Sequence, residues 1–175
     1  MHIKIIGCPD KKFRPFVKRA TQFFSDCLLS KRMQENTSIK IKFTNKIDDC
    51  GSAMIDGYNL QNKPRSFIIE VNSDMGAKDI LYTLAHELVH VRQYAYGHTN
   101  ESLSKWHDLK IDSDKVDYWY QPWEVEAFGL EKGLLTKFAT EEKLWDVFAE
   151  FRNPEKKLKK DKIIWKKSYL DKKVL

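Results

Sequence analysis

The sequence predicts a single α+β domain with an N-terminal helix, a small mixed or antiparallel sheet and helices towards the C-terminus. A length of 175 residues fits one domain and allows a sizeable buried core. Strand-like and helix-like segments are both present, but they do not alternate regularly, which favours α+β over a parallel α/β sheet. No apolar run approaches the ~18 residues that a membrane-spanning helix needs, so we expect no membrane association.

The first two elements follow from hydrophobic spacing. The opening "MHIKII" alternates in polarity and predicts a short strand. Residues 13–32 predict an amphipathic helix, in which Pro15 is tolerated because it falls in the first turn. The apolar residues of this helix recur at spacings of three and four: Phe13, Phe16, Val17, Ala20, Phe23, Phe24, Cys27 and Leu28.

Three strand candidates come next. In "SIKIKFTN", residues 38–45, large apolar side chains alternate with polar ones, so one face of the strand is buried and the other is wet. "SAMIDGYN" follows at 52–59, and "SFIIEVN" at 66–72 is rich in β-branched residues. The intervening segments "DDCG" and "NLQNKP" have the composition of turns.

A long helix is expected over residues 76–96. Ser73 or Asp74 would cap its N-terminus, and Gly97 would end it. Its apolar face consists of Ile80, Leu81, Leu84, Leu88 and Val91.

The remainder of the chain predicts a loop and two helices. The loop, residues 98–120, ends in aromatic residues, and Pro122 suits the first position of a helix over 122–138. A last helix is expected over 141–151, with Thr140 as its N-cap and an Asn-Pro dipeptide as its stop.

Residues 86–90 form the pattern H-E-x-x-H within the long helix. A spacing of four residues puts His86 and His90 about 40° apart around the helix axis, so both imidazoles can hold one ion. Two neutral imidazoles suit Zn²⁺, which takes a third protein ligand and leaves one position for water. Zinc would lower the pKa of that water towards about 7, and Glu87 would accept the proton as the water attacks a carbonyl. The alternative is a metal-free helix that carries two histidines by chance.

The residues alone leave the third ligand open. Glu124 and Glu126 stand at the start of the following helix, and a separation of two makes them face roughly opposite ways, so only one can point at a metal. Glu124 shares its face with Ala127, whose small side chain would let the two helices pack closely. His98 and His107, in the intervening loop, are further candidates, although histidines in surface loops usually have no such role.

The motif "HELVH" followed by "PWEVEA" resembles the gluzincin side of the zincin metallopeptidases. More narrowly, the chain resembles the small single-domain metallopeptidases of phages and bacteria that are akin to the SprT-like and ImmA/IrrE-like groups. SprT itself uses a third histidine, which "PWEVEA" argues against. The resemblance covers about residues 37–138 and implies a zincin-like domain that hydrolyses peptide bonds with zinc.

This resemblance implies a set of site residues. Relatives with an E-x-x-A pattern use its glutamate as ligand, which corresponds here to Glu124, with Ala127 as the alanine. The implied zinc ligands are then His86, His90 and Glu124, and the implied general base is Glu87.

The resemblance also implies a residue that orients one of the histidine ligands and a place for the substrate. Gluzincins often place a carboxylate or amide four residues after the ligand to orient a histidine, but here that position holds Phe128, so this partner is unidentified. A polypeptide substrate would lie along an edge strand by β-addition, and residues 67–71 are the expected strand.

Four other residues near the motifs each have two possible roles. Tyr118 and Tyr120 could donate a hydrogen bond to the oxyanion of a tetrahedral intermediate, although packing among neighbouring tryptophans is the favoured role. Arg92 and Gln93 could brace the site, although a solvated helix face is the default expectation.

The net charge of +6 lies at the C-terminus. Residues 155–175 hold nine lysines against three acidic residues, so residues 1–154 are neutral overall. We therefore expect a metallopeptidase domain at 1–154 and a basic extension at 155–175. Such an extension could bind nucleic acid through its phosphates, and the alternative function is a catalytically silent zincin-fold binding or regulatory module.

Cysteine usage and the start of the chain predict the compartment. The three cysteines, Cys8, Cys27 and Cys50, form no C-x-x-C pair and are expected to be reduced thiols. The first residues lack the apolar core of a signal peptide. We therefore expect a cytoplasmic monomer, located in the host cytoplasm if a phage encodes it.

Overall fold

The computed structural model describes residues 1–145. Residues 146–154, at the end of the expected domain, and the basic extension at 155–175 lie outside the described residues. The boundary between them and the nucleic-acid role of the extension stay predictions.

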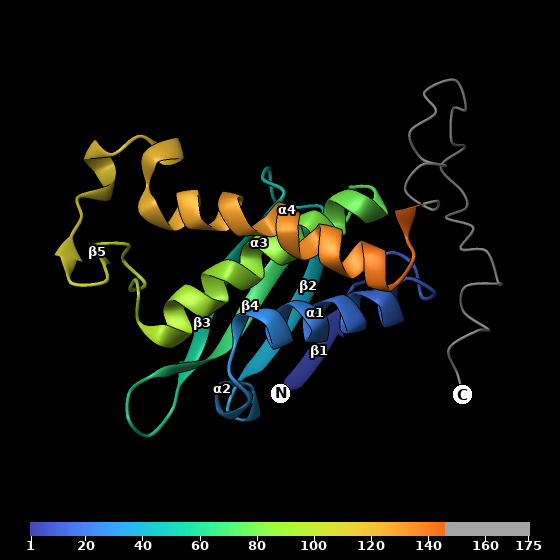
Figure 1. Cartoon of the computed structure of the whole chain (residues 1–175), viewed down its shortest axis with the longest axis horizontal. Helices are drawn as coiled ribbons and strands as arrows, with labels where there is room; N and C mark the ends of the chain where they lie inside the picture. The colour runs from blue at the N-terminus through green and yellow to red at the C-terminus, as the bar shows by residue number, and fades with distance from the viewer. Residues whose placement is uncertain (146–175) are drawn as a thin grey trace.

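The described chain is a small sheet with helices packed on it, so the expected α+β class is confirmed (Figure 1). The helices are α1 (Arg14–Leu28), α2 (Lys31–Glu35), α3 (Ala77–Tyr96) and α4 (Pro122–Glu141), with short 3-10 turns at Ser113–Lys115 and Tyr118–Tyr120. The strands are β1 (His2–Ile6), β2 (Ser38–Thr44), β3 (Gly51–Tyr58), β4 (Pro64–Asn72), β5 (Lys105–Trp106) and β6 (Leu109–Lys110). Within the described residues, no helix is both long enough and apolar enough to cross a membrane.

The main sheet is mixed, with strand order β1-β2-β4-β3. β1, β2 and β4 run parallel, and β3 pairs antiparallel with β4. β3 is therefore an edge strand, whereas β4 is hydrogen-bonded on both sides. This corrects one expectation: residues 67–71 belong to β4 and offer no free edge to a substrate.

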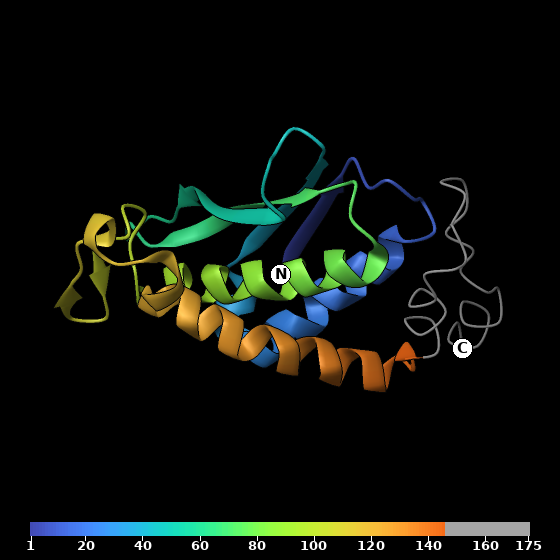
Figure 2. The same cartoon turned by 90° about the horizontal axis from the view of Figure 1, so that it is seen from above.

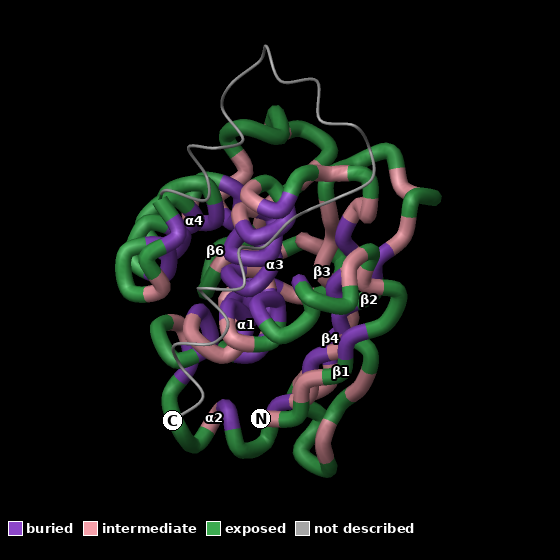
Figure 3. Tube along the Cα trace, turned by 90° about the vertical axis from the view of Figure 1, so that its right-hand side faces the viewer, coloured by how far each residue is buried: buried purple, intermediate pink, exposed green. Residues whose placement is uncertain are grey.

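The core lies between one face of this sheet and the helices. Alternation sends Phe67, Ile69 and Val71 of β4 inward, where they have no exposed surface. α1 and α3 lie along this face, and α4 packs on the side of α3 away from the sheet (Figure 2). α3 is thus enclosed between layers, as its run of buried residues shows (Figure 3). A helix in this position can hold polar side chains in a water-poor interior.

Two expectations about the first long helices need correction. The predicted helix over 13–32 is two helices, because Leu29 is extended and Ser30 caps α2 through a bond from the Met33 N–H. Neither Ser73 nor Asp74 caps α3, whose N-cap is Gly76, although Gly97 ends the helix in the left-handed conformation as predicted.

The C-terminal helix also differs from its prediction. α4 continues through Thr140 to Glu141, so no new helix starts at Thr140. It ends where Lys143 takes a positive φ of 55° and the Leu144 N–H bonds back to the Ala139 carbonyl. The rest of the expected last helix, residues 146–151, lies outside the described residues.

Candidate metal centre

The H-E-x-x-H segment lies in the middle of α3, on the side that meets α4 and β3. The spacing of four brings the two imidazole rings together, with centroids 4.8 Å apart. His86 and Glu87 are buried, and His90 is nearly so. α3 therefore holds the three side chains in one sheltered place.

α4 brings Glu124 to these histidines. Pro122 starts the helix, and Glu124 falls in its first turn. Ala127 is fully buried, and its small side chain allows α4 to approach α3 closely, as predicted. Glu124 Oε2 lies 3.2 Å from His86 Nε2, and Oε1 lies 3.6 Å from His90 Nε2. The two Nε2 atoms are 3.1 Å apart.

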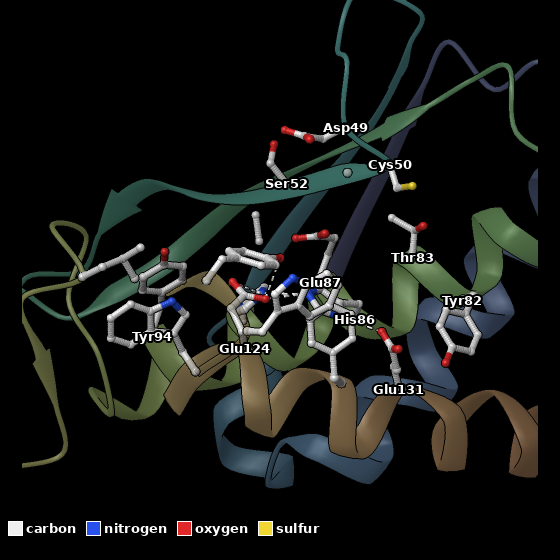
Figure 4. A pocket seen from close by; sticks show the side chains of 18 residues that line it. Asp49, Cys50, Ser52, Tyr82, Thr83, His86, Glu87, Tyr94, Glu124 and Glu131 are labelled. Atoms are coloured by element: carbon white, nitrogen blue, oxygen red, sulfur yellow. Dashed lines mark hydrogen bonds and ion pairs between the residues drawn. The ribbon is translucent and has the colours of Figure 1, made fainter. Parts of the chain in front are cut away.

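These three donors fit one zinc ion. They lie within 4.8 Å of one another, and they are the one such group of three or more among the described residues (Figure 4). Ligands placed tetrahedrally at about 2.1 Å from Zn²⁺ are about 3.4 Å apart, which is close to the separations of 3.1, 3.2 and 3.6 Å found here. The set of two imidazoles and one carboxylate is one that zinc accepts.

Each histidine is held by a second residue at its other nitrogen. His86 Nδ1 lies 2.7 Å from Glu131 Oε2, and His90 Nδ1 lies 2.8 Å from Gln93 Oε1. Both partner atoms are acceptors, so both Nδ1 atoms carry hydrogen and donate. In the neutral rings, the Nε2 atoms then present two lone pairs to each other at 3.1 Å. Such an arrangement favours a positive ion between them.

Gln93 owes its orientation to α4. Its Nε2 donates to the Trp123 carbonyl at 2.9 Å and to Glu126 Oε2 at 3.0 Å, which turns its oxygen towards His90. Gln93 has no exposed surface, so the expectation of a solvated position was wrong. Glu126 also binds Arg92 at 3.0 Å, so it braces the site from behind while Glu124 faces the histidines.

The site is strongly negative. Burial by itself would raise the pKa of Glu124, but the hydrogen bonds that His86 and His90 donate when their Nε2 atoms are protonated, with another from Tyr118, bring it down to about 2. Burial would lower the pKa of both histidines, yet the hydrogen bonds to Glu124 and the charge of Glu87 raise it. The carboxylates thus favour positive charge at the Nε2 atoms, whether a proton or a metal ion carries it.

Glu87 faces the edge strand rather than the metal donors. Its carboxylate lies between β3 and the His86 ring (Figure 4). A Cβ placed on Gly51 would come within 3.1 Å of Glu87 Oε1, so the absence of a side chain at Gly51 leaves room for this carboxylate. Burial raises the pKa of Glu87 to about 7, against the opposing effect of the two histidines.

A cavity of about 630 Å³ opens over these residues. Its lining includes residues 50–53, at and just before the start of β3, together with the aromatic side chains of Tyr118, Trp119, Trp123 and Phe128. Trp119, which is 64% exposed, packs on Phe128 with ring centroids 5.1 Å apart, and Phe128 packs on the His86 ring at 4.8 Å. We call Trp119 and Phe128 the aromatic wall. Phe128 stands at the position where a polar residue would orient a histidine. Its ring instead packs directly on the imidazole of the candidate ligand His86.

Tyr118 also lines the cavity. Its hydroxyl donates to Glu124 Oε2 at 2.9 Å, so it orients the candidate ligand, and it packs on Phe128 as well. Tyr120 is exposed and does not line the cavity.

His98 and His107 pack on each other beyond the end of α3 and lie outside the donor cluster. All three cysteines are free thiols, and Cys50 lies on the cavity rim.

Of the two residues that orient the histidines, the sequence did not identify Glu131, and it offered Gln93 only as a less favoured possibility. Glu131 lies seven residues after Glu124, which is two helical turns and therefore the same face, and this spacing was the available signal. Gln93 lies three residues after His90, also on a shared face, but its inward orientation depends on contacts from α4.

Comparison with known proteins adds no assignment. No family model matches the chain, and no curated protein or solved structure does either. The resemblance to the zincins therefore stays an expectation carried by the two motifs, and any functional conclusion depends on the geometry of the site.

Proposed function

We propose that the chain is a zinc-dependent metallopeptidase with a zincin-like fold. The observation that carries this proposal is the convergence of three donor atoms, His86 Nε2, His90 Nε2 and a Glu124 oxygen, beside the buried carboxylate of Glu87. A structural zinc site would have four protein ligands, whereas three ligands and an adjoining cavity are typical of a hydrolytic one.

The protein holds the ion in a defined orientation. Zn²⁺ bound here would supply Lewis acidity, which acidifies water and polarises a peptide carbonyl. Glu131 and Gln93 keep the Nδ1 hydrogens of the histidines engaged, so the Nε2 lone pairs stay directed at the donor cluster. Tyr118 fixes one Glu124 oxygen in the same way.

Glu87 is the proposed general base. It would accept a proton from the attacking water at a carboxylate oxygen and pass it to the leaving amine. Among residues 1–145, no side chain forms a hydrogen bond or ion pair with this carboxylate within bonding distance, so it is available for that exchange. Burial of the Glu87 carboxylate excludes bulk water, which would otherwise compete for its proton.

The edge of β3 is the proposed substrate strand. β3 pairs only with β4 in the described sheet, and its residues Gly51–Ala53 line the cavity. An extended peptide added to this free edge would place its backbone carbonyls over the metal donors. The substrate is therefore a polypeptide in extended conformation.

The aromatic wall would contact a substrate side chain. Trp119 and Phe128 line the same cavity as the start of β3, and both keep apolar ring surface exposed to water. An apolar side chain next to the scissile bond would cover both rings. We therefore expect peptides with a large apolar residue at that position to be cleaved best.

The test is cleavage of a fluorogenic peptide library by zinc-loaded wild-type protein and by Glu87→Gln. The variant keeps the size and the zinc ligands but has no basic carboxylate, so we expect full zinc content and a loss of hydrolysis of at least about a hundredfold. Glu141→Gln, an exposed substitution on α4, is the matched control and should cleave like the wild type. Wild-type activity in Glu87→Gln would rule out Glu87 as the base, and no cleavage of any peptide by the zinc-loaded wild type would overturn the peptidase proposal.

A further inference from the structure

A second cavity, of about 490 Å³, lies at a different place from the candidate metal centre. It is formed by α2 with its two cap residues and by the turn between β3 and β4 with the start of β4, and α2 and this turn lie on the same side of the molecule (Figure 1). Its lining residues are Ser30, Arg32, Met33, Asn36, Asn59, Gln61, Lys63 and Arg65. None of them lines the first cavity.

The two cavities have opposite charge. The first is lined by four carboxylates and by no lysine or arginine: Asp49, Glu87, Glu124 and Glu131. The second is lined by Arg32, Lys63 and Arg65 and by no carboxylate. Within the described part of the chain, none of these three cations forms an ion pair. Three unpaired cations around one concave surface create a positive potential that attracts anions.

Arg65 is fixed in place. Its Nη1 donates to the Pro64 carbonyl at 2.6 Å and to the Ala95 carbonyl at 3.0 Å, so the guanidinium is held between the hairpin and the end of α3. Its Nε and Nη2 donate to no acceptor among residues 1–145. A planar guanidinium with free donors and a fixed position is well suited to two oxygens of one anion.

The surroundings favour a small polar anion. The Tyr96 hydroxyl accepts from the Ser30 N–H at 3.0 Å, and this bond, helped by Arg92 and Arg65, lowers the tyrosine pKa. Asn36, Asn59 and Gln61 add amide groups to the lining. A volume of about 490 Å³ is in the range of small-molecule sites and exceeds the needs of a single ion.

We propose that this cavity binds the phosphate group of a small molecule, with Arg32, Lys63 and Arg65 as the cationic partners. A phosphate dianion carries three exposed oxygens for these donors, and both free phosphate and a nucleoside monophosphate present it. The site is independent of the proposed peptidase activity, because it shares no residue with the first cavity.

The test is a titration of the full-length ¹⁵N-labelled protein with inorganic phosphate and, in parallel, with adenosine monophosphate, followed by NMR. We expect saturable shifts confined to the amides of residues 30–36 and 59–65. Arg32→Gln with Lys63→Gln should weaken binding at least about tenfold, because each removes a charge-assisted hydrogen bond. Arg65 is left intact because its guanidinium also supports two backbone carbonyls.

Lys110→Gln with Lys132→Gln removes the same charge from exposed positions elsewhere and should bind like the wild type. Tighter binding of the nucleotide than of phosphate would identify a nucleotide site, and equal binding would identify a phosphate site; both support the proposal. No saturable shift at millimolar ligand, or equal weakening in both double variants, would overturn it.

Discussion

At the residue scale, the orientation of His86 depends on Glu131. The Glu131 carboxylate accepts the Nδ1 hydrogen at 2.7 Å, in a place where both side chains are buried. Glu131→Gln keeps the shape but loses the charge that makes the imidazole a better ligand, so zinc affinity should fall by about ten- to a hundredfold. Competition with a chromophoric chelator measures this affinity.

The control for this variant is again Glu141→Gln, which removes one carboxylate from the same helix at an exposed position. Its zinc affinity should equal that of the wild type, and the far-UV circular dichroism of both variants should be unchanged. If Glu131→Gln bound zinc as tightly as the wild type, Glu131 would have no part in holding His86.

The sequence predicted the roles of residues that depend on a single helix better than the roles that depend on the packing of two helices. The spacing of His86 and His90 fixes their common direction in any α-helix, so their convergence was predictable. The choice between Glu124 and Glu126 depends on the rotation of α4 against α3, which spacing does not give. Gln93 was named as a possible brace but not favoured for the same reason, because its amide is turned by the Trp123 carbonyl and Glu126.

At the element scale, β3 lies so close to α3 that one position has no room for a side chain. A Cβ on Gly51 would lie 2.5 Å from Thr83 Cγ2 and 2.9 Å from the Glu70 carbonyl oxygen. Gly51→Ala should therefore lower the free energy of unfolding by about 1–3 kcal/mol and, by displacing β3 from Glu87, reduce peptide hydrolysis. Urea denaturation and the peptide assay measure the two effects.

Gly57→Ala is the matched control on the same strand. A Cβ there would meet only Ser66 Cβ, at an ordinary 3.4 Å. Its stability should fall by clearly less than that of Gly51→Ala, and its activity should be unchanged. Equal effects of the two substitutions would show that the close approach at Gly51 has no special importance.

Element boundaries were less predictable than element types. Alternating polarity predicted β1 and β2, turn residues and β-branched content marked out β3 and β4, three- and four-residue spacing predicted α1 and α3, and Pro122 predicted the start of α4. The break at Leu29 was missed because apolar residues continue at helical spacing across it, and the extension of α4 past Thr140 was missed because Thr140 was interpreted as the N-cap of a new helix. The position of β4 inside the sheet is a matter of strand order, and local sequence does not encode strand order.

At the scale of the whole molecule, the proposed zinc ion joins two helices that belong to one core. His86 and His90 come from α3, and Glu124 comes from α4, so an ion held by all three would bind the folded chain and not the unfolded one. At a free zinc concentration of a hundred times Kd, such binding adds about 2.7 kcal/mol to the free energy of unfolding. Removing zinc with a chelator should then lower Tm by about 5–10 °C for a chain of this size.

Differential scanning calorimetry with and without the chelator measures this shift, and re-addition of zinc should reverse it. Glu124→Ala, which lacks one donor, should respond much less to the chelator than the wild type does. A wild-type Tm that did not change on chelation would contradict a role for zinc in joining α3 and α4.

The most direct test of the account is the zinc content of the purified, tag-free protein, measured by elemental mass spectrometry together with that of Glu124→Ala and Glu126→Ala. The geometry predicts one zinc per wild-type chain, loss of zinc in Glu124→Ala and retention in Glu126→Ala, because Glu126 faces Gln93 and Arg92. Loss in Glu126→Ala alone would contradict the assignment of the third ligand. A wild-type chain that binds no zinc even after reconstitution would contradict the metal centre itself.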